Sequence, residues 1–112
     1  MWSKIFASAF VSKPRFTIRL LRSAEEDLSD IVEFIAAENS NASVSILDRI
    51  ENDLHLLTRQ PYLGRIPEEE ELVRMGYRFL VILDYLAFYT IEERTIIVHR
   101  ILHGARDYLR IL

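Results

Sequence analysis

The stretch that decides the fold is Thr95-Ile96-Ile97-Val98-His99-Arg100-Ile101-Leu102-His103-Gly104-Ala105-Arg106-Asp107-Tyr108. It is rich in β-branched residues up to a glycine and then turns polar, which predicts a strand followed by a functional segment. Because side chains alternate along a strand, one face should carry Ile96, Val98, Arg100 and Leu102, and the other Ile97, His99, Ile101 and His103. Both faces contain apolar residues, so we expect an interior strand, covered on one side and open to a partner on the other.

Two more strands are expected before this last one, which should run from Arg94 to Leu102. The first spans Leu72 to about Leu83 and the second Tyr85 to Ile91, with turns near Asp84 and at Glu92-Glu93. The segment 61–71 before them contains two prolines, a glycine and four consecutive glutamates, so it should be a surface loop.

A strand and two helices are expected in the first half of the chain. The strand is Phe16 to Arg22, and Ser23-Ala24-Glu25-Glu26 has the pattern of a capping box that starts a helix. The second helix should run from about Ala42 to Arg59 and pair with the first as an antiparallel hairpin. The side chains at helical spacing that should face inward are Leu28, Ile31, Val32 and Ile35 in the first helix and Val44, Leu47, Ile50, Leu54 and Leu57 in the second.

The predicted fold class is α+β, with a helical hairpin on one face of a small antiparallel sheet, in the order β-α-α-β-β-β. One domain, residues 15–112, accounts for all of these elements, and residues 1–14 are expected to be an extension outside it. The apolar run 5–11 is at the short limit for an export signal. The sheet face without helices should offer a mixed patch to a partner, drawn from Phe79, Val81, Tyr85 and Tyr89.

The composition narrows the classes of function. A chain of 112 residues fits one domain, and the absence of cysteine excludes disulfides and thiol chemistry. The net charge of −3 is uneven: residues 1–71 carry 8 basic and 13 acidic side chains, and residues 72–112 carry 6 and 4. Either this reflects compositional bias, or the last third faces an anionic partner. No stretch is apolar enough to span a membrane, so we expect no membrane association.

The late strands gather arginine, tyrosine and histidine. Cleaving RNA without a metal requires a base for the 2′-hydroxyl, cations around the phosphate and a proton donor for the leaving oxygen. Arginine can clamp a phosphate, tyrosine can stack on a base, and histidine titrates near neutrality. His99 and His103 would lie ~13 Å apart along a strand, too far to share a zinc ion, so no metal or other cofactor is expected. The alternative is that the tyrosines belong to the core and the arginines form local ion pairs.

The segment Ile101-Leu102-His103-Gly104-Ala105-Arg106-Asp107, preceded by Tyr85–Tyr89 and by Gly76-Tyr77-Arg78, resembles the RelE/ParE superfamily of type II toxin–antitoxin toxins. The resemblance covers about residues 15–112. It implies a toxin that a cognate antitoxin neutralises in a hetero-oligomeric complex. It also implies action in the cytoplasm, where family members either cleave mRNA on the ribosome or inhibit DNA gyrase.

The resemblance also implies site residues. Arg106 matches the family's C-terminal arginine, Arg78 matches an arginine on the sheet less closely, and His103 and Tyr108 complete the expected catalytic set. Arg74, Arg100 and Tyr89 are expected to bind RNA or another target. We expect mRNA cleavage first; the alternatives are inhibition of gyrase by binding, or a degenerate member that is no longer toxic. The segment that holds lysines in the nucleases has four glutamates here and no lysine, which weakens the case for cleavage.

Overall fold

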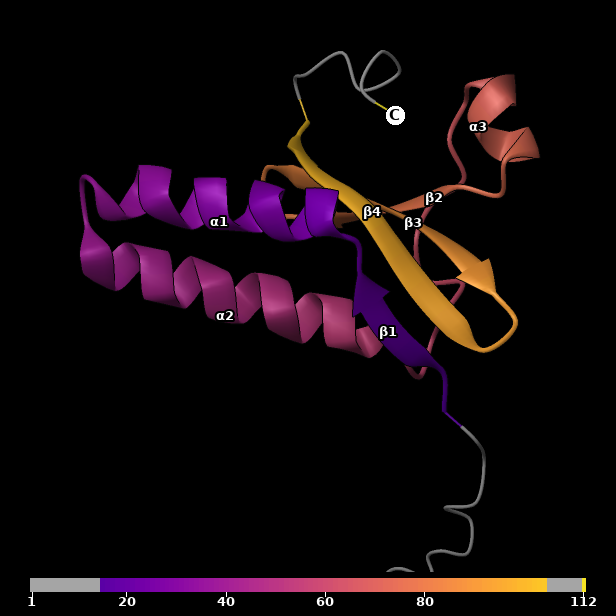
Figure 1. Cartoon of the computed structure of the whole chain (residues 1–112), viewed down its shortest axis with the longest axis horizontal. Helices are drawn as coiled ribbons and strands as arrows, with labels where there is room; N and C mark the ends of the chain where they lie inside the picture. Colours follow the sequence, from indigo (N-terminus) through magenta and orange to yellow (C-terminus); the bar gives the residue numbers. More distant parts are fainter. Residues whose placement is uncertain (1–14, 105–111) are drawn as a thin grey trace, which may run out of the picture.

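The computed structural model describes residues 15–104 and 112, so the extension 1–14, Arg106 and Tyr108 lie outside the described residues. It confirms the α+β class: a helical hairpin packs against a four-stranded sheet (Figure 1). The elements in chain order are β1 (Thr17–Leu20), α1 (Arg22–Ala36), α2 (Ser40–Leu56), α3 (Glu70–Arg74), β2 (Arg78–Ile82), β3 (Tyr85–Glu92) and β4 (Thr95–His103).

The sheet has the strand order β1-β4-β3-β2 and is mixed, whereas the sequence predicted an antiparallel sheet. The strands β2, β3 and β4 form an antiparallel meander, but β1 pairs parallel to β4, with Thr17 opposite Thr95. Parallel strands need a long connection, and the hairpin α1–α2, helix α3 and strands β2 and β3 all lie between β1 and β4 in the chain. Both meander turns contain a residue with positive φ, Leu83 at 56° and Glu93 at 57°.

A β-bulge in β4 changes which residues share a face. Phe88 lies opposite Arg100 and Tyr89 lies opposite Val98, so His99 is an extra residue without a partner on β3. The alternation therefore shifts at this point. Ile101, and not Leu102, joins Ile96 and Val98 in the core beneath the helices, which corrects the expected faces of this strand.

The helices begin and end differently from the prediction. Helix α1 starts at Arg22 with Leu21 as its N-cap, and no capping box forms, because the Ser23 hydroxyl donates a hydrogen bond to the His99 carbonyl instead (2.7 Å). Helix α2 starts earlier than expected, at Ser40, since the side chain of Asn39 accepts a hydrogen bond from the backbone of Ala42.

Residues 72–77 are not part of a strand, contrary to the prediction. Leu72 lies in the short helix α3, and the chain then turns at Gly76, whose φ is 84°. Strand β2 begins only at Arg78. Leu72 is buried on the sheet face opposite the hairpin. A buried apolar residue next to a strand has the same sequence pattern as the start of that strand, so the predicted strand began too early.

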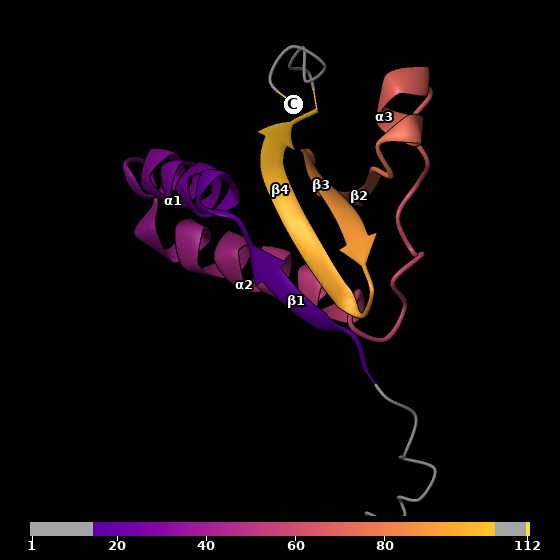
Figure 2. The same cartoon turned by 45° about the vertical axis from the view of Figure 1, so that its right-hand side comes forward.

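Two apolar clusters lie on the two sides of the sheet. The larger lies under the hairpin and includes Ile50, Leu54, Ala87, Tyr89 and Val98. The smaller lies under α3, on the opposite face (Figure 2), and consists of Leu72, Tyr77, Phe88 and Leu102, with Phe79, Leu86 and Leu112 packed against it.

Three side chains depart from the predicted burial. Tyr85 and Tyr89 belong to the covered side of the sheet, so the patch expected on the other face keeps only Phe79 and Val81 of the four residues predicted there. Val44, expected to face inward, is 60% exposed. Within residues 15–104, no helix is long and apolar enough to cross a membrane.

Candidate functional site

The sequence-predicted residues Arg78 and Tyr89 meet at the loop that precedes α3. Arg78, at the start of β2, donates hydrogen bonds to the carbonyl oxygens of Gly64 (3.0 Å) and Tyr62 (3.3 Å), and its guanidinium stacks 5.0 Å from the Tyr62 ring. The Nη1 group of Arg78 therefore binds the backbone of the loop. The residue predicted to clamp a phosphate braces the fold in this structure.

Tyr89 lies at the centre of the same arrangement. Its ring is fully buried, and its hydroxyl accepts a hydrogen bond from the Gly64 N–H (2.9 Å) and donates one to the Pro61 carbonyl (2.8 Å). Burial raises the pKa of Tyr89, although the Gly64 N–H and the charge of Arg78 oppose that rise. A ring in this position has no surface on which a base could stack, so the expected exposure of Tyr89 was wrong.

The close approach of the loop to Tyr89 explains the glycine at position 64. A Cβ built there would lie 2.6 Å from the Tyr89 hydroxyl and 2.8 Å from the Phe79 carbonyl. Any side chain would have to push the loop away from the sheet. Arg78, Tyr89 and Gly64 thus form one structural unit.

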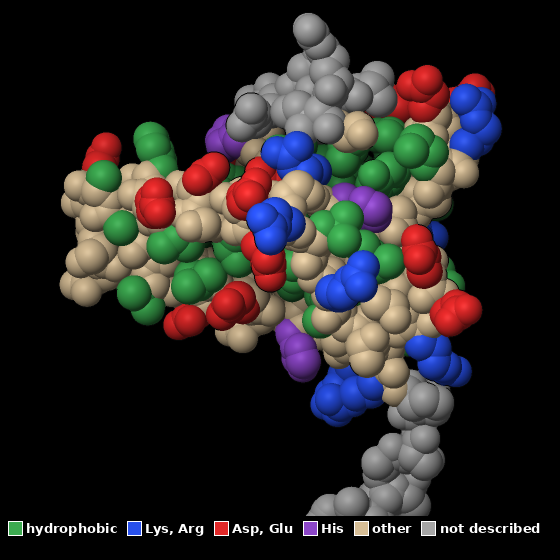
Figure 3. Space-filling view, in the orientation of Figure 1, with side chains coloured by type: hydrophobic (Ala, Val, Ile, Leu, Met, Phe, Trp, Pro, Cys, Tyr) green, Lys and Arg blue, Asp and Glu red, His purple; other side chains and the backbone are tan. Residues whose placement is uncertain are grey.

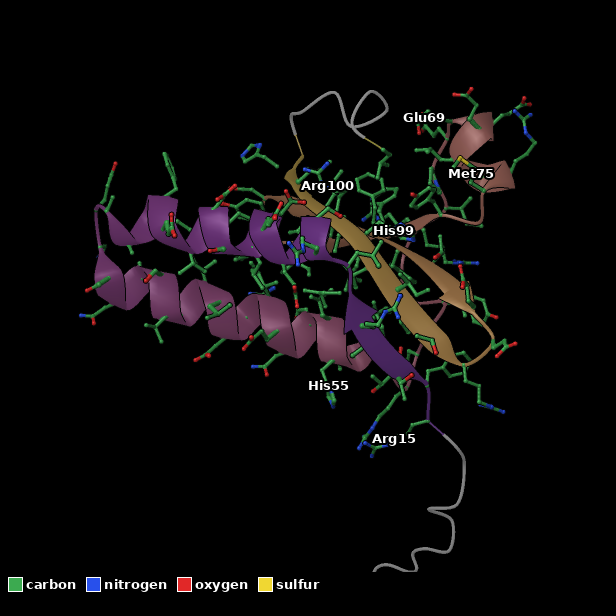
Figure 4. The ribbon with its side chains drawn as sticks, in the orientation of Figure 1. Arg15, His55, Glu69, Met75, His99 and Arg100 are labelled. Atoms are coloured by element: carbon green, nitrogen blue, oxygen red, sulfur yellow. The ribbon has the colours of Figure 1, made fainter. Side chains whose placement is uncertain are left out.

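His99, for which the sequence predicted no role, lies on β4 (Figure 4) at the β-bulge, and its ring nitrogens face two hydroxyl groups. Its Nε2 is 2.8 Å from the Thr90 hydroxyl, and its Nδ1 is 3.4 Å from the Tyr77 hydroxyl. The Tyr77 and His99 rings meet edge to face with centroids 4.9 Å apart. Burial lowers the pKa of His99, while the charge of Glu92 opposes the shift, and burial also raises the pKa of Tyr77. Nothing in the sequence pattern indicated this cluster, because the bulge depends on how β3 and β4 align.

Arg100, predicted to bind a target, is engaged by helix α1. Its Nε and Nη2 donate to the two oxygens of Asp27 at 2.7 and 2.8 Å, a bidentate pair, and this hydrogen bonding raises the pKa of Arg100. Asp27 also accepts the Ile101 N–H (2.9 Å), just after the bulge. Figure 4 shows Arg100 between β4 and the first turns of α1. The pair therefore fixes the bulge and the helix relative to each other.

The remaining predicted residues are spread out. Arg74 lies on α3, is largely exposed and is 4.0 Å from Glu70. His103 is exposed at the end of β4, where its ring meets Tyr85 edge to face with centroids 5.7 Å apart. The structure brings Arg78 and Tyr89 together but does not bring Arg74, Arg100 and His103 to one place. In the described part of the chain, no three His, Asp or Glu side chains are grouped so that they could hold a metal ion.

Comparison with known proteins shows which family the chain belongs to. Residues 18–108 match the family described as the ParE toxin of the type II toxin–antitoxin system parDE. The chain belongs to this family. It is therefore a toxin-family protein of the RelE/ParE superfamily, as the segment His103-Gly104-Ala105-Arg106-Asp107 (the HGxRD segment) indicated.

Solved structures with this fold include two toxin–antitoxin systems. One is the chromosomal ParDE system of P. aeruginosa, at 18% identity and a TM-score of 0.67, covering 79% of this chain and 95% of that chain. Another is the RelBE2 toxin–antitoxin complex of Mycobacterium tuberculosis, at 20% identity and a TM-score of 0.55, covering 80% and 98%. No curated protein matches the chain.

Proposed function

We propose that this chain is a growth-inhibiting toxin that binds DNA gyrase, acts in the cytoplasm, and is neutralised by a cognate antitoxin in a hetero-oligomeric complex. Membership of the ParE family supports the toxin class, and the similar solved structures are toxin–antitoxin systems. The choice of target rests on the contacts that the predicted catalytic and binding side chains make within the described part of the chain.

The observation that carries the choice is that these side chains have structural partners. Arg78 donates to loop carbonyls, Arg100 is paired with Asp27, and Tyr89 is buried. Metal-independent cleavage of RNA needs a proton acceptor, a proton donor and cations converging on one phosphate. Within residues 15–104, the predicted residues do not converge in this way, whereas an inhibitor that docks on its target needs no catalytic group.

Cleavage of mRNA is the competing function, and one observation favours it. His103 is exposed at the end of β4 and directly precedes the segment that contains Arg106 and Tyr108. Histidine and arginine are residue types that proton transfer near a phosphate can use.

Induced expression with separate labelling of new DNA, RNA and protein distinguishes the two functions. We expect DNA synthesis to fall first, with intact transcripts, because gyrase is needed for replication. An early loss of translation with cut transcripts would replace our proposal with the nuclease. Normal growth at confirmed soluble expression would mean that the chain is a non-toxic family member.

A further inference from the structure

An apolar groove lies between the end of α2, the loop that follows α2 and the edge strand β2. Its volume is about 270 Å³, and it is lined by Leu56, Leu63 and Val81, each of which is 43–48% exposed. The charged residues among its lining are Asp53 and Arg65. Single exposed apolar side chains are common on protein surfaces, but several that share one groove indicate a binding surface.

We propose that residues 1–14 of this same chain bind in this groove, an interaction that goes beyond the proposed function. The segment has no acidic residue and contains five large apolar side chains, Trp2, Ile5, Phe6, Phe10 and Val11. Trp2, Ile5 and Phe6 have the i, i+3, i+4 spacing of one helix face, so a helical turn would present them to the groove together. An apolar occupant of this kind suits a groove whose walls are mostly apolar.

The point where this segment joins the domain lies beside the end of α2 (Figure 1). The Phe16 N–H donates a hydrogen bond to the carbonyl of Thr58 (3.0 Å), two residues after Leu56 in the wall of the groove. Fourteen residues span ~21 Å as a helix and up to ~46 Å when extended, so the groove is within reach. Because the segment is tethered, its effective concentration at the groove is on the order of millimolar, which favours it over a separate molecule at micromolar concentration.

Charge and size argue against other occupants. The hairpin residues 22–56 carry nine acidic and two basic side chains, a net charge of −7, and Figure 3 shows the acidic groups spread along the hairpin. Lys4 and Lys13 give the segment the opposite sign, whereas a nucleic acid or a second hairpin would be repelled. Small-molecule sites commonly measure ~300–1,000 Å³ and hold several convergent polar groups, which this smaller groove lacks.

The chain provides its own probe for this test, because Trp2 is its only tryptophan and its fluorescence reports on the segment alone. In the purified full chain we expect blue-shifted Trp2 emission and weak quenching by acrylamide, since the docked ring is removed from water. Both properties should disappear when the chain is unfolded in urea. Emission and quenching in the folded chain that equal those in urea would overturn the proposal.

Variants of the groove show whether it is the docking site. Leu56→Asp combined with Val81→Asp places two charges among the apolar walls, so Trp2 emission should shift to the red and quenching should rise to the level of the unfolded chain. Phe34→Asp combined with Val44→Asp is the matched control, because these exposed apolar residues lie toward the other end of the hairpin. Circular dichroism checks that both variants are folded. Equal changes in the two variants, or no change in the groove variant, would contradict the proposed site.

Variants of the segment leave every residue of the groove in place, so they remain informative if the groove variant does not fold. Phe6→Asp should expose Trp2 as the groove variant does, because it removes a side chain of the apolar face. Ser8→Asp adds the same charge on the opposite side of that helical pattern and should leave the emission blue-shifted. Exposure of Trp2 by both substitutions, or by neither, would refute the helical docking face.

Dilution and lipid separate this interaction from its alternatives. Docking within one chain is independent of protein concentration, so the blue shift should persist on dilution. A blue shift that is lost on dilution would assign the segment to a second copy of the chain, and one that appears only with anionic phospholipid vesicles would assign it to a membrane surface; either result overturns the proposal. None of these measurements uses toxicity, so they decide the docking whether or not the chain inhibits gyrase.

Discussion

At the scale of single residues, the Tyr89 hydroxyl stabilises the fold by joining β3 to the loop before α3. Tyr89→Phe removes both of its hydrogen bonds and leaves the Gly64 N–H and the Pro61 carbonyl without this partner. We expect the free energy of unfolding to fall by about 1–3 kcal/mol, measured by urea denaturation. Tyr85→Phe, also on the helix side of the sheet but half-buried, is the matched control and should change stability little. Equal losses in the two variants would contradict the role given to the loop contact.

His99 predicts a pH dependence of stability. Burial lowers the pKa of folded His99 below its ordinary value of 6.5, so the unfolded chain binds the proton more readily. The contribution of His99 is therefore fully present above pH 6.5 and is lost as the pH falls below it toward the folded pKa. Its slope can reach ~1.4 kcal/mol per pH unit.

Urea denaturation between pH 5 and 8 checks this dependence. His99→Gln removes the titrating ring and should give a flatter curve over the same range, while carboxylates contribute equally to both proteins. A parallel decline in the variant would assign the pH dependence to other groups.

Arg106 lies outside the described residues, and its role stays a prediction from the HGxRD segment. Arg106→Ala should leave the domain folded and largely relieve toxicity, because a surface ion pair is worth only ~0–1 kcal/mol whereas a contact with the target is not replaced. Arg106→Lys should restore toxicity only in part, since lysine keeps the charge and loses the planar fork. Growth after induction measures this; a folded, fully toxic alanine variant would exclude Arg106 from the site.

At the scale of elements, the contact between α1 and the bulge of β4 joins two parts of the fold through one carboxylate. Asp27→Ala leaves the Arg100 guanidinium and the Ile101 N–H without their partner. Both side chains of the pair are largely buried, so we expect a loss of about 2–4 kcal/mol in the free energy of unfolding. Asp53→Ala, which breaks the exposed pair with Arg49, should cost less than ~1 kcal/mol. Similar losses at the two sites would show that the bulge does not depend on Asp27.

The sequence predicted elements better than it predicted their contacts. Periodicity located the hairpin, β3 and β4 to within a few residues, because their apolar spacing is set by local geometry. It could not locate the bulge at His99, which depends on how β3 aligns with β4. Ser23 had the local pattern of a helix N-cap, but its hydroxyl donates a hydrogen bond to the carbonyl of His99, 76 positions away. Long-range contacts of this kind also gave Arg78 and Arg100, both expected at the functional site, partners within the fold.

At the scale of the whole molecule, charge is distributed in separate regions. The hairpin is acidic, whereas Arg15, Arg19 and Arg22, in and beside β1, are exposed and form no ion pair among the described residues. An acidic protein of this kind is poorly suited to hold RNA by itself, since affinity for phosphates comes from cations. A protein target and a protein antitoxin suit the surface better.

The central claim is that the chain inhibits gyrase by binding. The most direct test mixes the purified chain with gyrase and relaxed plasmid DNA and measures ATP-dependent supercoiling, with a translating ribosome–mRNA mixture assayed in parallel. We predict that supercoiling is inhibited as toxin is added, that the toxin co-purifies with gyrase, and that the mRNA stays intact. Unchanged supercoiling together with cleaved mRNA would contradict the account and identify the chain as a ribosome-dependent nuclease.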